Sequence, residues 1–232
     1  MTLLSATRGA VAGANGLAYA DLVAETGPVA WWPLDSNLVD HIGGRDGVIG
    51  AGSAIHAGPL PKDSGGSFDC AGTNWISVGH ALALKPAVGS VMVWFKPSAL
   101  GDFRIVNCDE TGTASNNFAL TTLATGLISA YWQVSGVHTE ISTTSAYYTS
   151  GQIVQAICTW NGSGVALYLD GNRIGTNNQH TDGLASNILD WHFGHSQLAG
   201  GEIFNGVIDE IVIWDRALTR NEIYLLAQTE PD

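Results

Sequence analysis

The run Val-Ile-Asp-Glu-Ile-Val-Ile-Trp at residues 207–214 combines strong β-formers with two adjacent carboxylates. Side chains alternate across a strand, so Asp209 would share one face with Ile211. Glu210 would share the other face with Val212. A strand that is apolar on both faces lies inside a layered β-structure, where an ionised carboxylate needs a hydrogen-bond donor, a counter-charge or a metal. The run therefore predicts a central strand with a buried, compensated Asp209, and it points Asp209 and Glu210 in opposite directions.

A capping box follows this strand. Thr219 and Glu222 are three positions apart, so the Thr219 hydroxyl can accept a hydrogen bond from the first helical turn while Glu222 reaches back to the Thr219 N–H. Ile223 and Leu226 give the segment an apolar side. A short C-terminal helix is expected here, and it is the only regular helix that the sequence indicates.

Turn residues separate many short β-rich runs. Asn161-Gly162 and Asp170-Gly171 are two-residue turns that join antiparallel strands, because glycine tolerates positive φ. The 232 residues include 29 Gly and only 13% charged residues, which suits one β-domain with a large interior. The expected fold is an all-β antiparallel sandwich, with candidate strands at 30–34, 66–70, 75–78, 90–96, 103–107, 117–122, 127–133, 153–160, 165–170, 189–194 and 207–214.

Three segments carry a family resemblance. They read Gly-Pro-Val-Ala-Trp-Trp-Pro-Leu-Asp at 27–35, Val-Ala-Leu-Tyr-Leu-Asp-Gly-Asn-Arg-Ile-Gly at 165–175 and Phe-Asn-Gly-Val-Ile-Asp-Glu at 204–210. In this order they resemble the laminin-G-like branch of the concanavalin A-like lectin and glucanase superfamily. The resemblance implies a jelly-roll β-sandwich over residues 20–228, with an N-terminal arm at 1–19 and a short tail at 229–232.

Two further stretches, Tyr-Ala-Asp-Leu-Val at 19–23 and Gly-Arg-Asp-Gly at 44–47, are similar to copies of this domain in bacteriophage tail and surface proteins. The chain departs from the family at Gln152-Ile153, where relatives often have Trp-His at the head of a hairpin strand. That departure leaves the fold expectation intact but warns against transferring surface sites from relatives.

The charge balance restricts the partners. Nine Lys and Arg against 21 Asp and Glu give a net charge of −12, which disfavours nucleic acid, and no run approaches the length of a membrane span. The segment 1–20 does not have the pattern of a signal peptide, so synthesis in a host cytoplasm is expected. Cys70, Cys108 and Cys158 lack the spacing of a zinc or redox motif, and reduced thiols are the simpler interpretation. One disulfide remains an alternative.

Catalytic motifs are missing from the sequence. Glucanases of the superfamily carry Glu-x-Asp-x-Glu on one strand, which puts the acid and the nucleophile on one face, and this array is absent here. Nucleophile-elbow, P-loop and His-Glu-x-x-His motifs are absent as well. The sequence therefore predicts that the chain is not an enzyme, with a divergent glycoside hydrolase as the less favoured alternative.

Short acidic residues suggest a calcium site. Asp35 and Asp46 lie in the loops after the first aromatic strand, and the resemblance places that region near the strand of Asp209. Hard oxygen ligands suit Ca²⁺, so these three carboxylates are the candidate metal ligands. The alternative is that they accept hydrogen bonds from backbone amides of turns. His192 and His195 lack an evident third ligand for zinc.

Aromatic residues near strand ends suggest glycan contacts. Tyr147, Tyr148, Trp132 and Trp191 are the candidates, because an exposed ring could stack on the apolar face of a sugar. The alternative is that these rings belong to the core, as most aromatic residues of β-sandwiches do.

The first 16 residues are rich in Gly and Ala and would fray without a surface to pack on. They form either an edge strand of the same domain or an attachment arm, with Leu3, Leu4 and Arg8 as the anchoring residues. The leading hypothesis is a non-catalytic module on the surface of a phage virion, either a decoration protein or a tail appendage. Its expected partners are capsid or tail proteins, further copies of itself and a cell-surface glycan. The alternative is a free calcium-dependent lectin.

Overall fold

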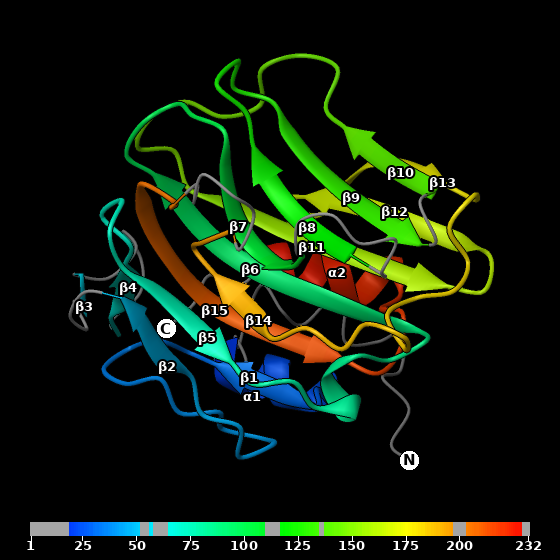
Figure 1. Ribbon diagram of the computed structural model, residues 1–232, viewed down its shortest axis with the longest axis horizontal. Helices are drawn as coiled ribbons and strands as arrows, with labels where there is room; N and C mark the ends of the chain where they lie inside the picture. Colours follow the sequence, from blue (N-terminus) through cyan, green and yellow to red (C-terminus); the bar gives the residue numbers. More distant parts are fainter. Residues whose placement is uncertain are drawn as a thin grey trace.

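The computed structural model describes residues 19–51, 56–57, 65–109, 117–134, 137–196 and 203–228. In these residues two antiparallel sheets stack as a sandwich with two α-helices, which confirms the predicted jelly-roll fold (Figure 1). The proposed arm residues Leu3, Leu4 and Arg8 lie outside the described residues. None of the helices in the described part of the chain is long and apolar enough to cross a membrane.

Sheet A has the strand order β13-β12-β11-β6-β15-β4-β3, and β1 pairs with β15 beside this path. Sheet B has the order β10-β9-β8-β7-β14-β5-β2. The strands of sheet A are β1 (Ala30–Trp32), β3 (His56–Ala57), β4 (Ser67–Asp69), β6 (Gly89–Pro97), β11 (Val154–Asn161), β12 (Gly164–Leu169), β13 (Asn172–Asn177) and β15 (Gly206–Trp214). Those of sheet B are β2 (Val48–Ala51), β5 (Trp75–Val78), β7 (Phe103–Cys108), β8 (Asn117–Thr122), β9 (Ile128–Val134), β10 (Val137–Ser142) and β14 (Trp191–Phe193).

The main core lies between the sheets and is built on large rings. Phe118 of β8 has its ring centroid 5.3 Å from that of Trp132, 6.0 Å from Trp160 and 5.8 Å from Trp191. These rings come from both sheets, and all of them are fully buried. Because alternate residues of each strand enter this core, the intervening residues form the two outer faces of the sandwich.

A second apolar cluster covers part of the outer face of sheet A. It packs α1 (Tyr19–Glu25) and α2 (Arg220–Gln228) against β6, β11, β12 and β15. Trp94 Nε1 donates to the Tyr19 hydroxyl at 2.8 Å, and Gln155 Nε2 donates to Leu226 O of α2 at 2.8 Å. The expectation of a single regular helix is therefore wrong, because α1 is a second helix, which the Trp94–Tyr19 hydrogen bond holds on the sheet.

Four strands were absent from the sequence expectations, namely β2, β3, β10 and β13. All four lie at the edges of the sheets. An edge strand has neighbours on one side only, and β13 keeps no fully buried residue while β10 buries only Thr139 and Ile141. Strands of this kind lack the alternating apolar pattern that reveals an inner strand.

The central strand β15 contains a bulge between Asp209 and Val212, and Glu210 has a φ of 49°. Ile208 before the bulge and Ile211 after it both face the main core, so one residue more than the alternation allows has been inserted. Asp209 is fully buried, as predicted. The prediction that Asp209 and Glu210 point apart is wrong, because both carboxylates lie near the buried Tyr19 hydroxyl under α1. Burial raises the pKa of Tyr19 most, and the charges of Glu210 and Asp209 raise it further.

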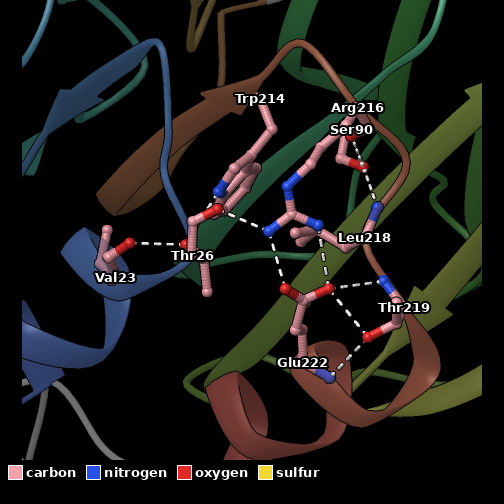
Figure 2. A network of polar contacts seen from close by, with 8 residues as sticks. All are labelled: Val23, Thr26, Ser90, Trp214, Arg216, Leu218, Thr219 and Glu222. Carbon is pink, nitrogen blue, oxygen red and sulfur yellow. Dashed lines mark hydrogen bonds and ion pairs between the residues drawn. The ribbon is translucent and has the colours of Figure 1, made fainter. Parts of the chain in front are cut away.

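The predicted capping box is present at the start of α2 (Figure 2). Glu222 N donates to Thr219 Oγ1 at 3.3 Å, and Thr219 N donates to Glu222 Oε2 at 2.8 Å. The Arg216 guanidinium forms a bidentate ion pair with the Glu222 carboxylate, with N···O distances of 2.7 and 3.0 Å. It also donates a hydrogen bond to Thr26 O at the end of α1. Both helices are therefore tied to the end of β15.

Candidate functional site

Three of the four aromatic residues proposed to stack on a sugar are in the core. Trp132 and Trp191 are fully buried and Tyr148 is 1% exposed. Their exposure was predicted wrongly, because each lies on the inner side of a strand or under a turn that packs on the core. Tyr147 is partly exposed, and its hydroxyl donates to Asp170 Oδ2 at 2.9 Å.

The three proposed calcium ligands do not converge. Asp35 Oδ1 accepts from Gly66 N, Asp46 Oδ1 accepts from Asp40 N, and Asp209 lies under α1. Within the described residues no three His, Cys, Asp or Glu side chains are grouped to hold a metal. Asp35 and Asp46 therefore follow the alternative, in which backbone N–H groups of the loops donate to the carboxylates, and Asp209 accepts from the N–H of Glu210 in the bulge of β15. Calcium binding itself stays a prediction, and melting curves in calcium and in chelator test it, because a ligand of the folded state alone raises the melting temperature.

A row of polar and aromatic side chains instead crosses the outer face of sheet B. Strand pairing places Ser77, His192, Asn107, Ala119 and Tyr131 side by side from β5 to β9. Their neighbours Ile76, Phe193, Cys108, Phe118 and Trp132 enter the main core, so this row faces away from it. Five strands thus contribute one residue each to this face of the sheet.

Trp75 lies at one end of this row. Its indole stacks on the imidazole of His195, with ring centroids 4.5 Å apart and an angle of 17° between the planes. Gly50 of β2 makes room for the ring, since a Cβ there would come within 2.2 Å of the indole. His192 approaches the same indole edge-on at 4.9 Å. Trp75 is partly exposed, so the sheet presents an aromatic ring held by its neighbours.

Asp109 directly follows β7 and contacts Tyr131 at the other end of the row. The Tyr131 hydroxyl donates to Asp109 Oδ2, and Arg104 Nε approaches the same oxygen at 3.3 Å. The Arg104 guanidinium also lies over the Tyr131 ring, 5.4 Å from its centroid. Burial raises the pKa of Asp109 in spite of the hydrogen bonds from Tyr131 and Arg104 that lower it.

Burial favours the uncharged form of His192 and His195 by lowering the pKa of each. Burial lowers the pKa of His192 to about 4, with the neighbouring His195 lowering it further. Burial also lowers the pKa of His195, against the opposing effect of the Asp109 charge. The two imidazoles and the Asp109–Arg104 ion pair contribute little net charge, whereas Glu140 of β10, which is paired with Tyr131, adds a carboxylate at the edge of this face.

Several buried polar atoms here lack a partner. Asn107 Oδ1, Asp109 Oδ1 and His195 Nδ1 are buried without a hydrogen-bond partner in the described part of the chain. The Asn107 amide group is nevertheless fixed, because it donates to the backbone oxygens of His192 and His195. Buried polar groups are nearly always satisfied by protein, water or ligand, so these atoms mark positions that call for a hydroxyl group, from a buried water or from a ligand.

We call Trp75, Asn107, Asp109, Tyr131 and His195 the sheet B cluster. The sequence did not predict this cluster, although His192 and His195 are only three positions apart. The alternation of apolar and polar residues could have revealed part of it. A polar or aromatic residue stands between two core residues in three of the strands, at Asn107, Tyr131 and His192. Their convergence required the order of the strands in the sheet.

A family model described as the concanavalin A-like lectin/glucanases superfamily matches residues 71–224. The chain belongs to this superfamily. No curated protein matches the chain. Among solved structures it is similar to domain 4 of AbnA, a GH43 extracellular arabinanase from Geobacillus stearothermophilus, in complex with arabinotriose. That domain is 19% identical, with a TM-score of 0.72, over 87% of this chain and 98% of the other.

A second structure of similar fold is the botulinum neurotoxin serotype D ligand binding domain in complex with N-acetylneuraminic acid. It is 16% identical, with a TM-score of 0.66, and the match covers 90% of this chain and 53% of that one. A third is the binding domain of Paraclostridial mosquitocidal protein 1, at 15% identity and a TM-score of 0.69, over 88% of this chain and 52% of the other. The chain spans about half the length of these toxin domains, and such distant similarity establishes the shared fold alone.

Proposed function

We propose that this chain is a non-catalytic carbohydrate-binding module that binds sugar at the sheet B cluster. The observation that carries the proposal is the partly exposed Trp75 ring stacked on His195, whose backbone oxygen accepts from Asn107, an amide with an unpartnered Oδ1 in the described part of the chain. Ligand sites combine apolar or aromatic surface with a few placed polar groups. A sugar matches both parts, because its C–H face packs on an indole and its hydroxyls donate to carboxylate and amide oxygens.

The solved neighbours add support. One is in complex with arabinotriose, and another, of which this chain matches about half, is in complex with N-acetylneuraminic acid, so sugar ligands occur among proteins that share this fold. In this chain the nearly neutral charge of the cluster favours a neutral sugar over an acidic one.

The test is calorimetric titration of the full chain with arabinotriose and other neutral trisaccharides, with N-acetylneuraminic acid as the acidic comparison. Trp75→Ala and Asp109→Asn should each weaken binding about tenfold or more, because each removes one contact of about 1–2 kcal/mol. Gly50→Ala should weaken binding as well by displacing the indole. Tyr224→Ala is the matched control, since Tyr224 is an exposed aromatic residue of α2. Saturable binding that none of the cluster variants alters would place the glycan elsewhere.

The proposal also includes the absence of catalysis. The Asp109 carboxylate is engaged by Tyr131 and Arg104, and the sequence lacks the single-strand carboxylate array of the glucanases. We expect no release of reducing sugar from β-glucans or arabinans. Release that a single Asp or Glu substitution abolishes would contradict this part of the proposal.

A placement on a phage virion rests on the resemblance of residues 19–23 and 44–47 to phage proteins. In this proposal the module is attached through residues 1–16 to capsid or tail proteins and presents its glycan site outward. The experiment is mass spectrometry of purified particles from a host that carries the gene, with and without a deletion of residues 2–16. Loss of the deleted, folded protein from particles would support attachment through the arm, and unchanged incorporation would contradict it.

A further inference from the structure

A groove of about 780 Å³ lies on the outer face of sheet A, on the opposite side of the sandwich from the sheet B cluster. It runs over β11, β12 and β13 and is bounded by Ala217 and Leu218, which follow β15. Its volume falls in the range of roughly 300–1,000 Å³ that is usual for small-molecule sites. All of its lining residues lie in the described part of the chain.

The floor of the groove exists because one row of the sheet carries small side chains. Thr176, Ala166 and Thr159 are paired side by side across β13, β12 and β11. Ala166 belongs to the outer cluster, whereas its neighbours Val165 and Leu167 enter the main core, so this row faces outward. Elsewhere this face carries Tyr168 and the two helices, which are much larger. The small side chains therefore leave a groove between these neighbours.

The groove has rigid walls. Tyr168 is 8% exposed and packs in the outer cluster on one side. On the other side the Leu218 backbone is held by Ser90, whose hydroxyl accepts from Leu218 N and donates to Arg216 O, both at 3.0 Å (Figure 2). The Arg216–Glu222 pair anchors the same segment. The wall is therefore part of the network that ties α2 to the sheet.

Two asparagines at the end of the groove are oriented by the backbone. Asn161 Oδ1 accepts from Ser163 N at 2.7 Å, and Asn177 Oδ1 accepts from Gln179 N at 2.9 Å. These bonds use the carbonyl oxygen of each side chain and leave its NH₂ group to donate to a ligand. Both NH₂ groups are thus placed before any ligand arrives, which lowers the ordering cost of binding.

The lining contains no Asp, Glu, Lys, Arg or His, although the whole chain carries a net charge of −12. We infer that this groove is a second ligand site, specific for an uncharged, hydroxyl-rich glycan. Fixed amide donors, threonine hydroxyls and one tyrosine suit a sugar better than an apolar ligand, and the lack of a cation disfavours an acidic sugar. The groove and the sheet B cluster lie on opposite faces of the sandwich. An experiment can therefore contradict one of the two proposed sites and leave the other standing.

The test is a titration of the ¹⁵N-labelled full chain with neutral trisaccharides, followed by NMR. The side-chain NH₂ signals of Asn161 and Asn177 report on the groove, and the indole N–H of Trp75 reports on the sheet B cluster. Saturable shifts of the two NH₂ signals are expected at sugar concentrations up to about 10 mM. N-acetylneuraminic acid should shift them much less.

Substitutions decide whether the groove binds. Asn161→Asp and Asn177→Asp keep the oxygen that accepts from the backbone but remove the NH₂ donors, and together they should weaken binding about tenfold or more. Asn172→Asp is the matched control on the same strand, because Asn172 is exposed and does not line the groove. Trp75→Ala should leave the groove affinity unchanged.

Each outcome supports or overturns one proposal. Shifts of the Trp75 indole alone would overturn the second site and leave the proposed function standing. Shifts of the groove signals alone would support the second site and contradict the sheet B cluster as the sugar site. Groove shifts of equal affinity in the double variant and in the control would overturn the groove as the binding site.

Discussion

The indole Nε1 of Trp31 donates a 2.6 Å hydrogen bond to Oε2 of Glu210, and this bond joins β1 to the bulge of β15 across 179 positions of the chain. Both residues are buried, and Glu210 adopts a φ of 49°. A non-glycine residue at positive φ is costly, and it persists where the surrounding structure compensates for the strain. The Trp31 indole contributes to this compensation, because its N–H donates a hydrogen bond to the Glu210 carboxylate, which the bulge places under α1.

Glu210→Ala should therefore destabilise the fold. The substitution strands the Trp31 N–H without its acceptor, which costs about 1–3 kcal/mol of unfolding free energy. Glu210→Gln keeps an oxygen acceptor at the same place and should cost less. Urea unfolding of the two variants measures the difference, and equal loss in both would show that the hydrogen bond is not the source of the effect.

Asp40 organises the loop between β1 and β2. Its Oδ1 accepts from the backbone N–H groups of Trp31, Ile42 and Gly43, each at 3.0 Å, and its Oδ2 accepts from Arg45 N at 3.0 Å. We expect Asp40→Ala to lower the unfolding free energy by about 2–4 kcal/mol, because these charged hydrogen bonds are lost together. Asp40→Asn, with one oxygen left, should be intermediate. Denaturant melts check both, and an unchanged midpoint for Asp40→Ala would contradict the assignment.

Glu222 predicts a pH dependence of stability. Burial alone would raise its pKa, but the hydrogen bonds from Arg216 and Thr219 outweigh burial and hold the pKa below its ordinary value of 4.5. A carboxyl whose pKa is lower when folded contributes stability that is complete above its unfolded pKa and is lost as the pH falls through the folded pKa. The stability difference between wild type and Glu222→Gln should therefore be largest at neutral pH and shrink below pH 4.5. A difference that stays constant from pH 7 to pH 3 would contradict this coupling.

The three cysteines should be inert in the folded chain. Cys70, Cys108 and Cys158 are free thiols with no exposed surface, which agrees with the expectation of reduced thiols. Burial raises the pKa of each, so little reactive thiolate is present. A thiol reagent such as Ellman's reagent should label none of them before unfolding and all of them in denaturant. Rapid labelling of a thiol in the native state would indicate local opening at that strand.

Local sequence patterns were sufficient for the inner strands and for the start of α2. The runs at 75–78 and 117–122 coincide with β5 and β8, and Thr219 with Glu222 forms the box that its spacing predicts. These features depend on neighbours within a few positions. The edge strands β10 and β13 were missed for the same reason, because they bury too little to show a pattern.

The sequence by itself determined the sandwich and the burial of Asp209, because apolar alternation and turn residues are properties of short stretches of sequence. Only the tertiary structure decided which way Glu210 faces, since a one-residue bulge reverses every side chain after it. It also decided that Trp132 and Trp191 fill the core while Trp75 remains partly exposed. Burial of an aromatic residue depends on which face of its strand meets the other sheet, and that choice is made by packing between segments far apart in the chain.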